Sequence, residues 1–484
     1  MRITNLNPAA DIGASAWLVE VDGCRLLMDA GTHPKREGRD ALPLYHKLRP
    51  GTDVAAIALT HCHHDHVGSL PVALRHFQQA HVLMTELSYF IIERVLHNPV
   101  NGMTRQREEF GIKEYPLYTH DEVDEIAALF QGFRHGREVE WASFEKLNSG
   151  RPSPTMEFLD AGHTLGAAGV MVRGARQSLF YTGDVSFGDQ TLIRGARFDG
   201  VQADVLVLET TRGAKATPPG WSRDAEIARL EETIVATLAR KGSVLIPAFA
   251  LGRTQEILAI LALMQRKKRI PRQPIYIGGL GRVFTEIFDL EAHRAHRNHS
   301  GLRLTESLHL QVMGKNELEA MRPAGGRIYV LTSGMMAERT AAHDLALRFT
   351  ADERNAICFV GYTDPETPGG RLRAAQPGGT FFFSRSGGEE ERLAGLRRAE
   401  APAGGLLRGG AARRDFFLQP RRRRPHPPLR GAGLRHDGSR AARGAAGLRR
   451  RGGPAGRHPR PRRRRRAGVV CPRNRRPSPE GEGA

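Results

Sequence analysis

Residues 60–68, Thr-His-Cys-His-His-Asp-His-Val-Gly, place His61, His63, Asp65 and His66 within six positions of one another. Side chains at alternate positions of an extended segment project to the same side, so His61 and His63 can bind one metal ion. As the chain turns into a helix, Asp65 and His66 can face a second ion. This spacing predicts a metal site on a loop that joins a strand to a helix.

The segments around this cluster predict strands that each end in a polar side chain. The apolar run 54–60 leads directly into the cluster, and the second strand of an earlier predicted hairpin ends at Asp29. Three further apolar segments end at His163, Asp184 and Glu209. Strands that deliver polar residues to one edge are typical of a layered α/β core with its functional site along that edge.

Imidazole and carboxylate donors in this mixture suit zinc, and manganese is the alternative ion. Two such ions activate a water and stabilise the attacking and leaving oxygens of a displacement, which predicts a hydrolase. The motif alone does not choose among phosphodiester, lactam and thioester substrates, and a solvated His-rich loop is the competing interpretation. His64 and Cys62 lie off the pattern and are interpreted as bystanders. The predicted ligands are His61, His63, Asp65, His66, His163 and Asp184.

Residues 211–356 alternate between helical and strand patterns and predict a parallel α/β domain of their own. The helix-periodic stretch 223–241 lies between Ser222, a candidate N-cap, and Gly242, a candidate C-terminal stop.

Three residues of this region are candidates for a functional role. Arg253 begins a predicted helix, where the N-terminus attracts anions, so it is a candidate phosphate contact, with a surface arginine as the alternative. Ser333 follows a predicted strand and is either a contact to a substrate backbone or a plain turn residue. His343 lies on a predicted helix and is interpreted as a surface histidine.

The net charge of +20 comes entirely from the last fifth of the chain. Residues 381–484 hold 28 Arg, no Lys and 8 acidic side chains, whereas residues 1–380 sum to zero. This stretch has no Ile, Met, Thr, Tyr or Trp and predicts no core. It is either a disordered arm that binds phosphates by charge or the product of a GC-rich gene translated out of frame.

The four cysteines show no paired spacing, which excludes a disulfide framework and favours a reducing compartment. The sequence has no signal-peptide pattern at its start and no run of 18 apolar residues. We therefore expect a cytoplasmic protein without a membrane span. A homodimer is left open.

Together, these motifs resemble the metallo-β-lactamase fold: the cluster 60–68, DAGH ending at His163, YTGD ending at Asp184, and Asp29. Further segments resemble the β-CASP insertion of that fold, a subgroup of nucleases that includes the mRNA 3′-end-processing endonuclease and ribonuclease J. These segments are ETT at 209–211, PAFALGRTQEIL at 247–258, TSGMM at 332–336 and FVGY at 359–362.

The resemblance implies an α/β protein: a metallo-β-lactamase αββα sandwich interrupted by an inserted α/β β-CASP domain. On this basis we expect the first domain over residues 1–210, the insertion over 211–356, an apparently truncated return over 357–383, and a disordered Arg-rich tail over 384–484. It further implies a two-zinc enzyme that cleaves RNA, with single strands threaded between the domains.

Residue roles also follow from the resemblance. Glu209 matches the first β-CASP motif, an acid that orients a general-acid histidine, so Asp184 and Glu209 are the expected catalytic residues. The expected ligands of one zinc are His61, His63 and His163, those of the other are Asp65 and His66, and Asp184 bridges the two.

The family also carries two later histidines, in a Ser-Ala-His-Ala-Asp-like motif and in His-Gly-Glu, and the chain as translated contains neither. Codons for residues 418–423 can be chosen so that a one-nucleotide shift gives Phe-Ser-His-Ala-Asp. Codons for residues 441–445 can be chosen so that the same shift gives Gln-His-Gly-Glu. We therefore expect a nuclease gene whose product is impaired as given.

Two other functions remain as hypotheses. One is a thioester or lactone hydrolase of the same fold, against which the large insertion argues. The other is a catalytically damaged protein that binds nucleic acid through its Arg-rich arm.

Overall fold

The computed structural model describes residues 1–9, 11–49, 51–140, 154–314 and 325–375, together with the strands β17 (Phe381–Ser384) and β18 (Glu390–Leu393). All of these residues belong to one compact unit of the chain. Two domains can be distinguished within it by their sheets.

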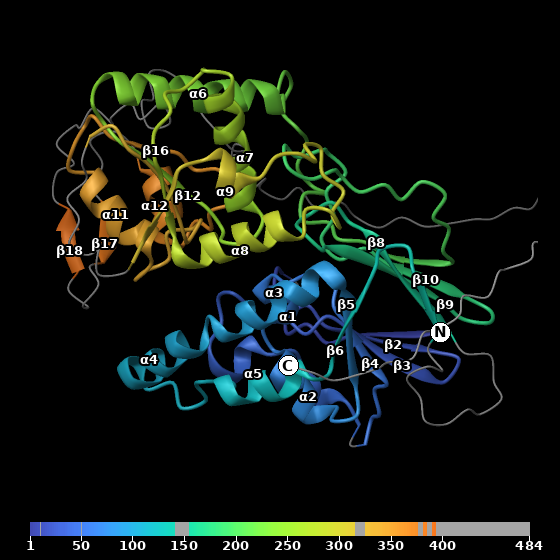
Figure 1. Ribbon diagram of the computed structural model, residues 1–484. Helices are drawn as coiled ribbons and strands as arrows, with labels where there is room; N and C mark the ends of the chain where they lie inside the picture. The colour runs from blue at the N-terminus through green and yellow to red at the C-terminus, as the bar shows by residue number, and fades with distance from the viewer. Residues whose placement is uncertain are drawn as a thin grey trace, which may run out of the picture. The chain divides into compact units, whose positions relative to one another are not determined.

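The first domain is built on two sheets (Figure 1). In the first sheet the strands follow chain order; β1 to β3 pair antiparallel and β3 to β6 pair parallel. The predicted hairpin is confirmed, with Asp22 and Gly23 at its turn in the left-handed region at φ of 51° and 88°. The strands are β1 (Arg2–Asn5), β2 (Trp17–Val21), β3 (Cys24–Met28), β4 (Ala56–Ala58), β5 (His81–Thr85) and β6 (Phe130–Phe133).

The second sheet has the order β11-β10-β9-β8-β7. Its pairs are antiparallel except for β10 with β11, which run parallel. The strands that were predicted to end at His163, Asp184 and Glu209 are β8, β10 and β11. Their bounds and those of their neighbours are β7 (Glu138–Glu140), β8 (Thr155–Asp160), β9 (Ala168–Arg173), β10 (Ser178–Tyr181) and β11 (Val205–Val207).

The inner faces of the two sheets share one apolar core. Because side chains alternate across a strand, Val19 and Met28 of the first sheet meet Phe158 and Val170 of the second. The opposite face of the first sheet packs under helices, with Leu27 in the core beneath them. The helices of this domain are α1 (His64–Val67), α2 (Leu70–His76), α3 (Glu86–His97), α4 (Val100–Phe110) and α5 (His120–Ala127), with short 3-10 turns at Gly38–Ala41 and Tyr45–Lys47. This confirms the predicted α/β sandwich sheets.

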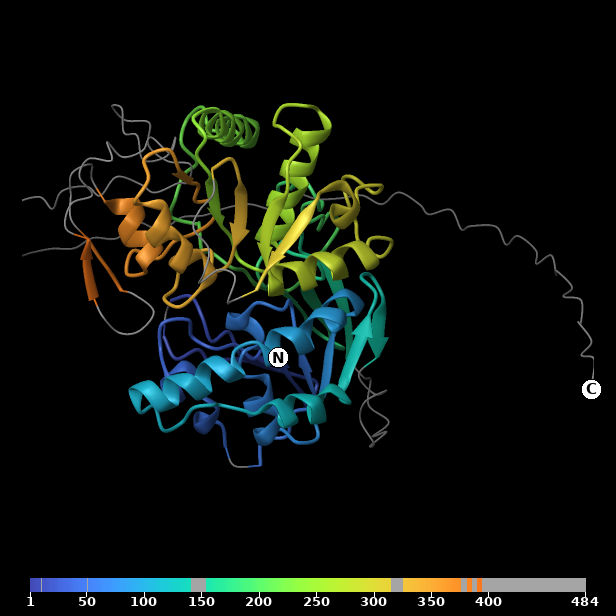
Figure 2. The same ribbon diagram turned by 60° about the vertical axis from the view of Figure 1, so that its left-hand side comes forward.

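The second domain has a five-stranded sheet whose strands all run parallel, in the order β14-β13-β15-β12-β16 (Figure 2). Val244 and Ile246 of β12 face a core with α6, α7 and α8, while Leu245 faces α11 and α12. The strands are β12 (Val244–Pro247), β13 (Ile275–Gly278), β14 (Leu310–Met313), β15 (Ile328–Leu331) and β16 (Ala356–Ile357). The helices are α6 (Arg223–Ala239), α7 (Arg253–Arg266), α8 (Gly279–Leu290), α9 (Leu304–Ser307), α11 (Ala341–Phe349) and α12 (Pro368–Ala374).

Helix α6 begins as predicted, because the Ser222 side chain accepts a hydrogen bond from the Ala225 N–H. Its end differs from the prediction, since Lys241 takes the left-handed conformation at φ 60°. Gly242 is needed for space instead: a Cβ there would lie 1.7 Å from the Arg354 carbonyl oxygen.

The second domain extends beyond the predicted boundary at residue 356. β16 (Ala356–Ile357) pairs with β12, and the Cys358 N–H donates to the Leu245 carbonyl at 2.8 Å. Phe359 and Leu372 pack in the core of this sheet. The segment predicted to return to the first domain therefore remains with the second domain as far as α12.

Two smaller predictions also differ. His343 is fully buried on α11 rather than on the surface, because it lies on the face that packs against the sheet. Strand β18 (Glu390–Leu393) pairs with β17 inside the stretch predicted to be disordered. The rest of the predicted tail lies outside the described residues. No helix within the described ranges has the length and apolar character that a membrane crossing requires.

A glycine holds the metal-site loop against the hairpin. A Cβ on Gly31 would lie 1.7 Å from the Asp65 carbonyl oxygen, which also accepts the Ser15 N–H at 2.9 Å. We predict that Gly31→Ala lowers the free energy of unfolding by about 1–3 kcal/mol, since overpacking forces the backbone apart. Gly102→Ala on α4 is the control, because nothing lies within 4 Å of that position. The control should gain about 0.5–1 kcal/mol. Urea unfolding measures both, and equal stability of the two variants would contradict the prediction.

Candidate metal centre

Four segments that are far apart in the sequence meet at the ends of strands in the first domain. His61 and His63 follow β4, and Asp65 and His66 lie on the single turn of α1. His163 comes three residues after β8. Asp184 likewise comes three residues after β10. The predicted ligands are therefore brought to one edge of the sandwich.

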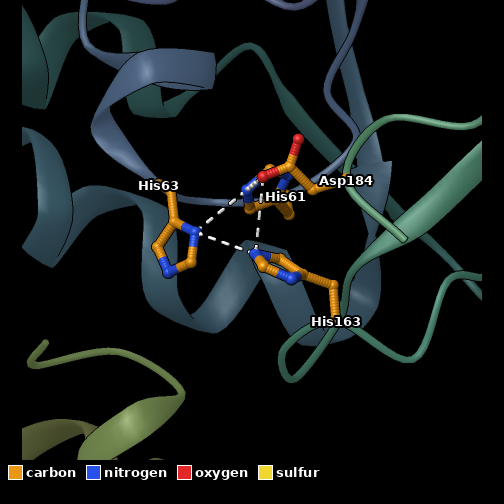
Figure 3. A group of neighbouring side chains, drawn as sticks. All are labelled: His61, His63, His163 and Asp184. Carbon is orange, nitrogen blue, oxygen red and sulfur yellow. Dashed lines mark hydrogen bonds and ion pairs between the residues drawn. The ribbon is translucent and has the colours of Figure 1, made fainter. Parts of the chain in front are cut away.

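The side chains of His61, His63, His163 and Asp184 point toward one another (Figure 3). His63 Nδ1 lies 3.1 Å from His61 Nε2 and 3.2 Å from His163 Nε2. Asp184 Oδ2 lies 3.6 Å from His163 Nε2 and 4.0 Å from His61 Nε2. Tetrahedral ligands at zinc bond lengths are about 3.3 Å apart, so this donor set fits one zinc ion.

For His61 and His63, the hydrogen bond made by one ring nitrogen indicates that the other nitrogen is bare, that is, without a proton. His61 Nδ1 lies 3.1 Å from Thr60 Oγ1, whose own proton is directed to Asp29 at 3.0 Å, so His61 donates from Nδ1. His63 donates from Nε2 to the Leu251 carbonyl at 3.4 Å. The remaining nitrogens, His61 Nε2 and His63 Nδ1, carry lone pairs that face each other. A cation between them satisfies both, as expected for metal-binding histidines whose other nitrogen is held.

A second group shares Asp184. His66 Nε2 lies 3.4 Å from Asp184 Oδ1 and 3.9 Å from Asp65 Oδ2. The two oxygens of Asp184 thus face different groups, Oδ2 toward the three histidines and Oδ1 toward His66. This is the arrangement that a carboxylate bridging two ions requires.

Asp29 organises the residues behind both groups. Its fully buried carboxylate accepts the Thr60 N–H at 2.8 Å, the Tyr181 hydroxyl at 3.0 Å and the His66 Nδ1–H at 2.8 Å. Donation from Nδ1 fixes the orientation of the ring and turns His66 Nε2 toward Asp184. Asp29 is therefore an orienting residue rather than a ligand, and the sequence pointed to it as a polar strand end without revealing that role.

Burial and the charges in the cluster shift the protonation of its members. Burial, with the neighbouring His63, lowers the pKa of His163 to about 4, and burial holds the pKa of His61 well below its usual value. These rings are therefore neutral near pH 7. Burial also acts to lower the pKa of His66, but the Asp29, Asp184 and Asp65 carboxylates outweigh it and raise that pKa well above its usual value. Burial opposes ionisation of Asp184, yet His66 and the other rings hold the pKa of its carboxyl far below its usual range.

The remaining candidates lie at different places around the centre. Glu209 is half-buried beyond β11, and its carboxylate accepts the Thr211 N–H at 2.9 Å. Arg253 is exposed at the first turn of α7. Ser333 follows β15, and its hydroxyl accepts the Ala337 N–H at 2.8 Å, so it stabilises a turn.

The predicted bystanders face away from the cluster. Cys62 is buried, with its thiol directed to the Ser88 carbonyl at 3.5 Å. His64 packs beside Gly68: a Cβ added to Gly68 would lie 2.7 Å from the His64 Nδ1.

The contribution of the second domain could not be predicted from the sequence. Leu251, whose carbonyl holds His63, precedes α7, and a Cβ on Gly252 would lie 2.9 Å from Thr164 Oγ1, beside His163. Backbone groups of this kind carry no residue signature. The start of α7 therefore lies directly against the metal-binding loops.

A second His and carboxylate group occurs on the surface of the first domain. Glu93 and His97 of α3 lie near Asp124 of α5, with His97 Nε2 3.1 Å from an Asp124 oxygen. Both carboxylates are exposed. Exposed pairs of this kind are common without an ion, so we assign no site there.

Comparison with known families agrees with this geometry. The model of the metallo-β-lactamase superfamily matches residues 10–235, and the model of the β-CASP domain matches residues 254–372. The chain belongs to the metallo-β-lactamase superfamily and carries a β-CASP domain. The second match includes β16 and most of α12, in agreement with the sheet to which they belong.

Similar proteins include ribonucleases from fungi and bacteria. Endoribonuclease ysh1 of Emericella nidulans is 28% identical over 374 residues, which cover 73% of this chain and 40% of the relative. Ribonuclease TTHA0252 of Thermus thermophilus is 29% identical over 392 residues, covering 78% of this chain and 83% of the relative. The cleavage and polyadenylation specificity factor subunit 3 of Dictyostelium discoideum is 25% identical, covering 75% and 45%. The chain thus spans less than half the length of the eukaryotic relatives named here.

The orienting role of Asp29 leads to a prediction about metal affinity. Asp29→Asn removes the charge that holds His66, and we expect zinc affinity to fall by about 10–100-fold, as for other residues behind metal-binding histidines. Asp11→Asn is the control, because its carboxylate pairs with His33 at 3.1 Å and not with His66. Competition with a chromophoric chelator measures both. An unchanged affinity in Asp29→Asn, or an equal loss in the control, would overturn the assignment.

Proposed function

We propose that this protein is a metal-dependent hydrolase that cleaves the phosphodiester bonds of RNA. The observation that carries the proposal is the pair of ligand groups that share Asp184, at one edge of the sandwich and against the start of α7. The names of its relatives, endoribonuclease and ribonuclease, support RNA as the substrate.

Zinc is the ion that the donor set favours, with manganese as the alternative. His61, His63, His163 and Asp184 would hold one ion, and Asp65, His66 and Asp184 a second. Bound there, the ions would lower the pKa of a water and neutralise charge on a phosphate.

The protein residues prepare the centre for this chemistry. Thr60 and Leu251 hold the rings of His61 and His63 so that their bare nitrogens converge. Asp29 fixes the orientation of the His66 ring by accepting a hydrogen bond from its Nδ1–H. Asp184 stays ionised because its pKa is far below neutrality. Its Oδ2 faces the histidine cluster and its Oδ1 faces His66.

The parallel sheet of the second domain supports a path for single-stranded RNA. Ligands of such sheets bind at the carboxyl ends of the strands, and here these ends carry the loops that begin at Ala248 after β12 and at Thr332 after β15. Arg253 is exposed at this edge, where its guanidinium and the N-terminus of α7 can meet a phosphate. We assign Ser333 to the same path as a backbone contact of the substrate.

The proposal includes an impairment of the chain as given. In the family, the acidic residue that Glu209 matches orients a general-acid histidine. The family's two later histidines would fall in the part of this chain that is Arg-rich and outside the described residues. Leu206 of the edge strand β11 is 57% exposed, and Leu208 is 48% exposed, so the described residues leave these two apolar side chains largely uncovered. A restored frame would supply both histidines.

We predict that cleavage depends on the ligand cluster and on the reading frame. The full chain and a version restored by the one-nucleotide shift are incubated with end-labelled single-stranded RNA and Zn²⁺ or Mn²⁺. The restored chain should cleave at least about a hundredfold faster, because general-acid catalysis contributes about 10²–10⁴-fold. Within that chain, His63→Ala, Asp184→Ala or a chelator should abolish cleavage.

The control is His293→Ala, an exposed histidine of the second domain, which should keep full activity. A restored chain that binds zinc but leaves RNA intact, or that hydrolyses small thioesters or lactones instead, would contradict the proposed function. Cleavage that survives in Asp184→Ala would contradict the assigned centre.

A further inference from the structure

Glu256 lies on the first turn of α7, in the second domain, and is only 3% exposed. A carboxylate buried to this degree requires partners that replace water. It has three: the Thr191 N–H at 2.7 Å, the Leu192 N–H at 2.9 Å and the guanidinium of Arg223. Two of these are backbone groups of the first-domain loop that follows Asp184.

The tip of that loop is held by the second domain. Leu192 and Ile193 are buried in a core that also contains Ile257 of α7. Asn298 adds hydrogen bonds from its side chain to the carbonyls of Gln190 at 2.7 Å and Ile193 at 3.2 Å. The loop is therefore anchored in the second domain at the residues that Glu256 holds.

The same loop supports the metal ligands at its other side. Asp184 begins it, and the Gln190 side chain donates to the carbonyls of Gly162 at 2.9 Å and His163 at 3.0 Å. The Ser186 N–H also donates to the Ala161 carbonyl at 2.9 Å. One loop thus connects Glu256 to two of the four residues of the ligand cluster.

We propose that Glu256 is a positioning residue that couples docking of the second domain to the geometry of the metal centre. Its carboxylate binds none of the proposed metal ligands, and it acts by fixing the loop that runs from Asp184 to Leu192 at its far end, Thr191 and Leu192. The metal centre then has its full affinity only when α7 is seated on this loop. The inference rests on the ligand cluster of the proposed function, and it adds that the second domain, besides offering a surface to RNA, controls metal binding.

The test compares zinc affinity with the stability of the metal-free protein in the full chain. Glu256→Gln keeps the size of the side chain but removes its charge. One of the two backbone N–H groups then faces the amide nitrogen, and Arg223 loses its ion pair while keeping its hydrogen bond to the Thr191 hydroxyl. Glu231→Gln is the matched control, since Glu231 pairs with Arg269 at 2.7 Å within the second domain and is 14% exposed. Zn²⁺ affinity is measured by competition with a chromophoric chelator, and stability by thermal unfolding without metal.

We expect Glu256→Gln to weaken Zn²⁺ binding by about tenfold or more, the range seen for residues that support metal ligands. Glu231→Gln should lower the melting temperature of the metal-free protein without changing its zinc affinity. A merely structural role predicts lower melting temperatures and equal affinities in both variants, and that result would overturn the inference.

If Glu256→Gln does not fold, Gln190→Ala examines the last link of the same connection, since it removes only the two bonds to the His163 loop. A folded Gln190→Ala chain with unchanged zinc affinity would overturn the inference. The readout does not depend on catalysis: a chain that cleaves no RNA can still lose zinc affinity in Glu256→Gln, which separates failure of the proposed function from failure of this inference.

Discussion

The convergence of bare imidazole nitrogens on one carboxylate is the constraint on which the rest of the structure depends. His61 Nε2 and His163 Nε2 both lie within 3.2 Å of His63 Nδ1, and the low pKa values of His61 and His163 leave these rings neutral. The lone pairs of His61 Nε2 and His63 Nδ1 repel at this separation unless a cation lies between them. The outer nitrogens of both rings have hydrogen-bond partners: His61 Nδ1 donates to Thr60 Oγ1, and His63 Nε2 donates to the Leu251 carbonyl. Asp29 in turn accepts the Thr60 hydroxyl.

The two domains share in maintaining this centre. The sandwich supplies the ligands from the ends of three strands and one helical turn, whereas the second domain supplies the Leu251 carbonyl and the Glu256 carboxylate. Both groups lie at the start of α7, so one helix terminus contacts the segment that carries His63 and the loop that begins at Asp184. The β-CASP domain is therefore part of the metal centre as well as a candidate surface for RNA.

Most of the architecture was predictable, because apolar runs that end in polar residues mark strands with a shared edge. The ligand positions followed from the spacing around His63 and from two strand ends. What the sequence did not reveal depends on contacts between distant segments: the burial of His343, the extension of the second domain through β16, and the role of Glu256. Helical periodicity identifies no particular partner, so neither His343 nor Glu256 could be placed from its own helix. The other domain boundaries and the site roles that were expected from the family remain predictions.

The most direct test of the account is anomalous X-ray scattering at the zinc edge from crystals of the full chain grown with Zn²⁺. The account predicts a strong peak within bonding distance of His61 Nε2, His63 Nδ1, His163 Nε2 and Asp184 Oδ2, and a second near Asp65, His66 and Asp184 Oδ1. An anomalous map with no peak at this cluster, or with peaks only beside other residues, would contradict the account.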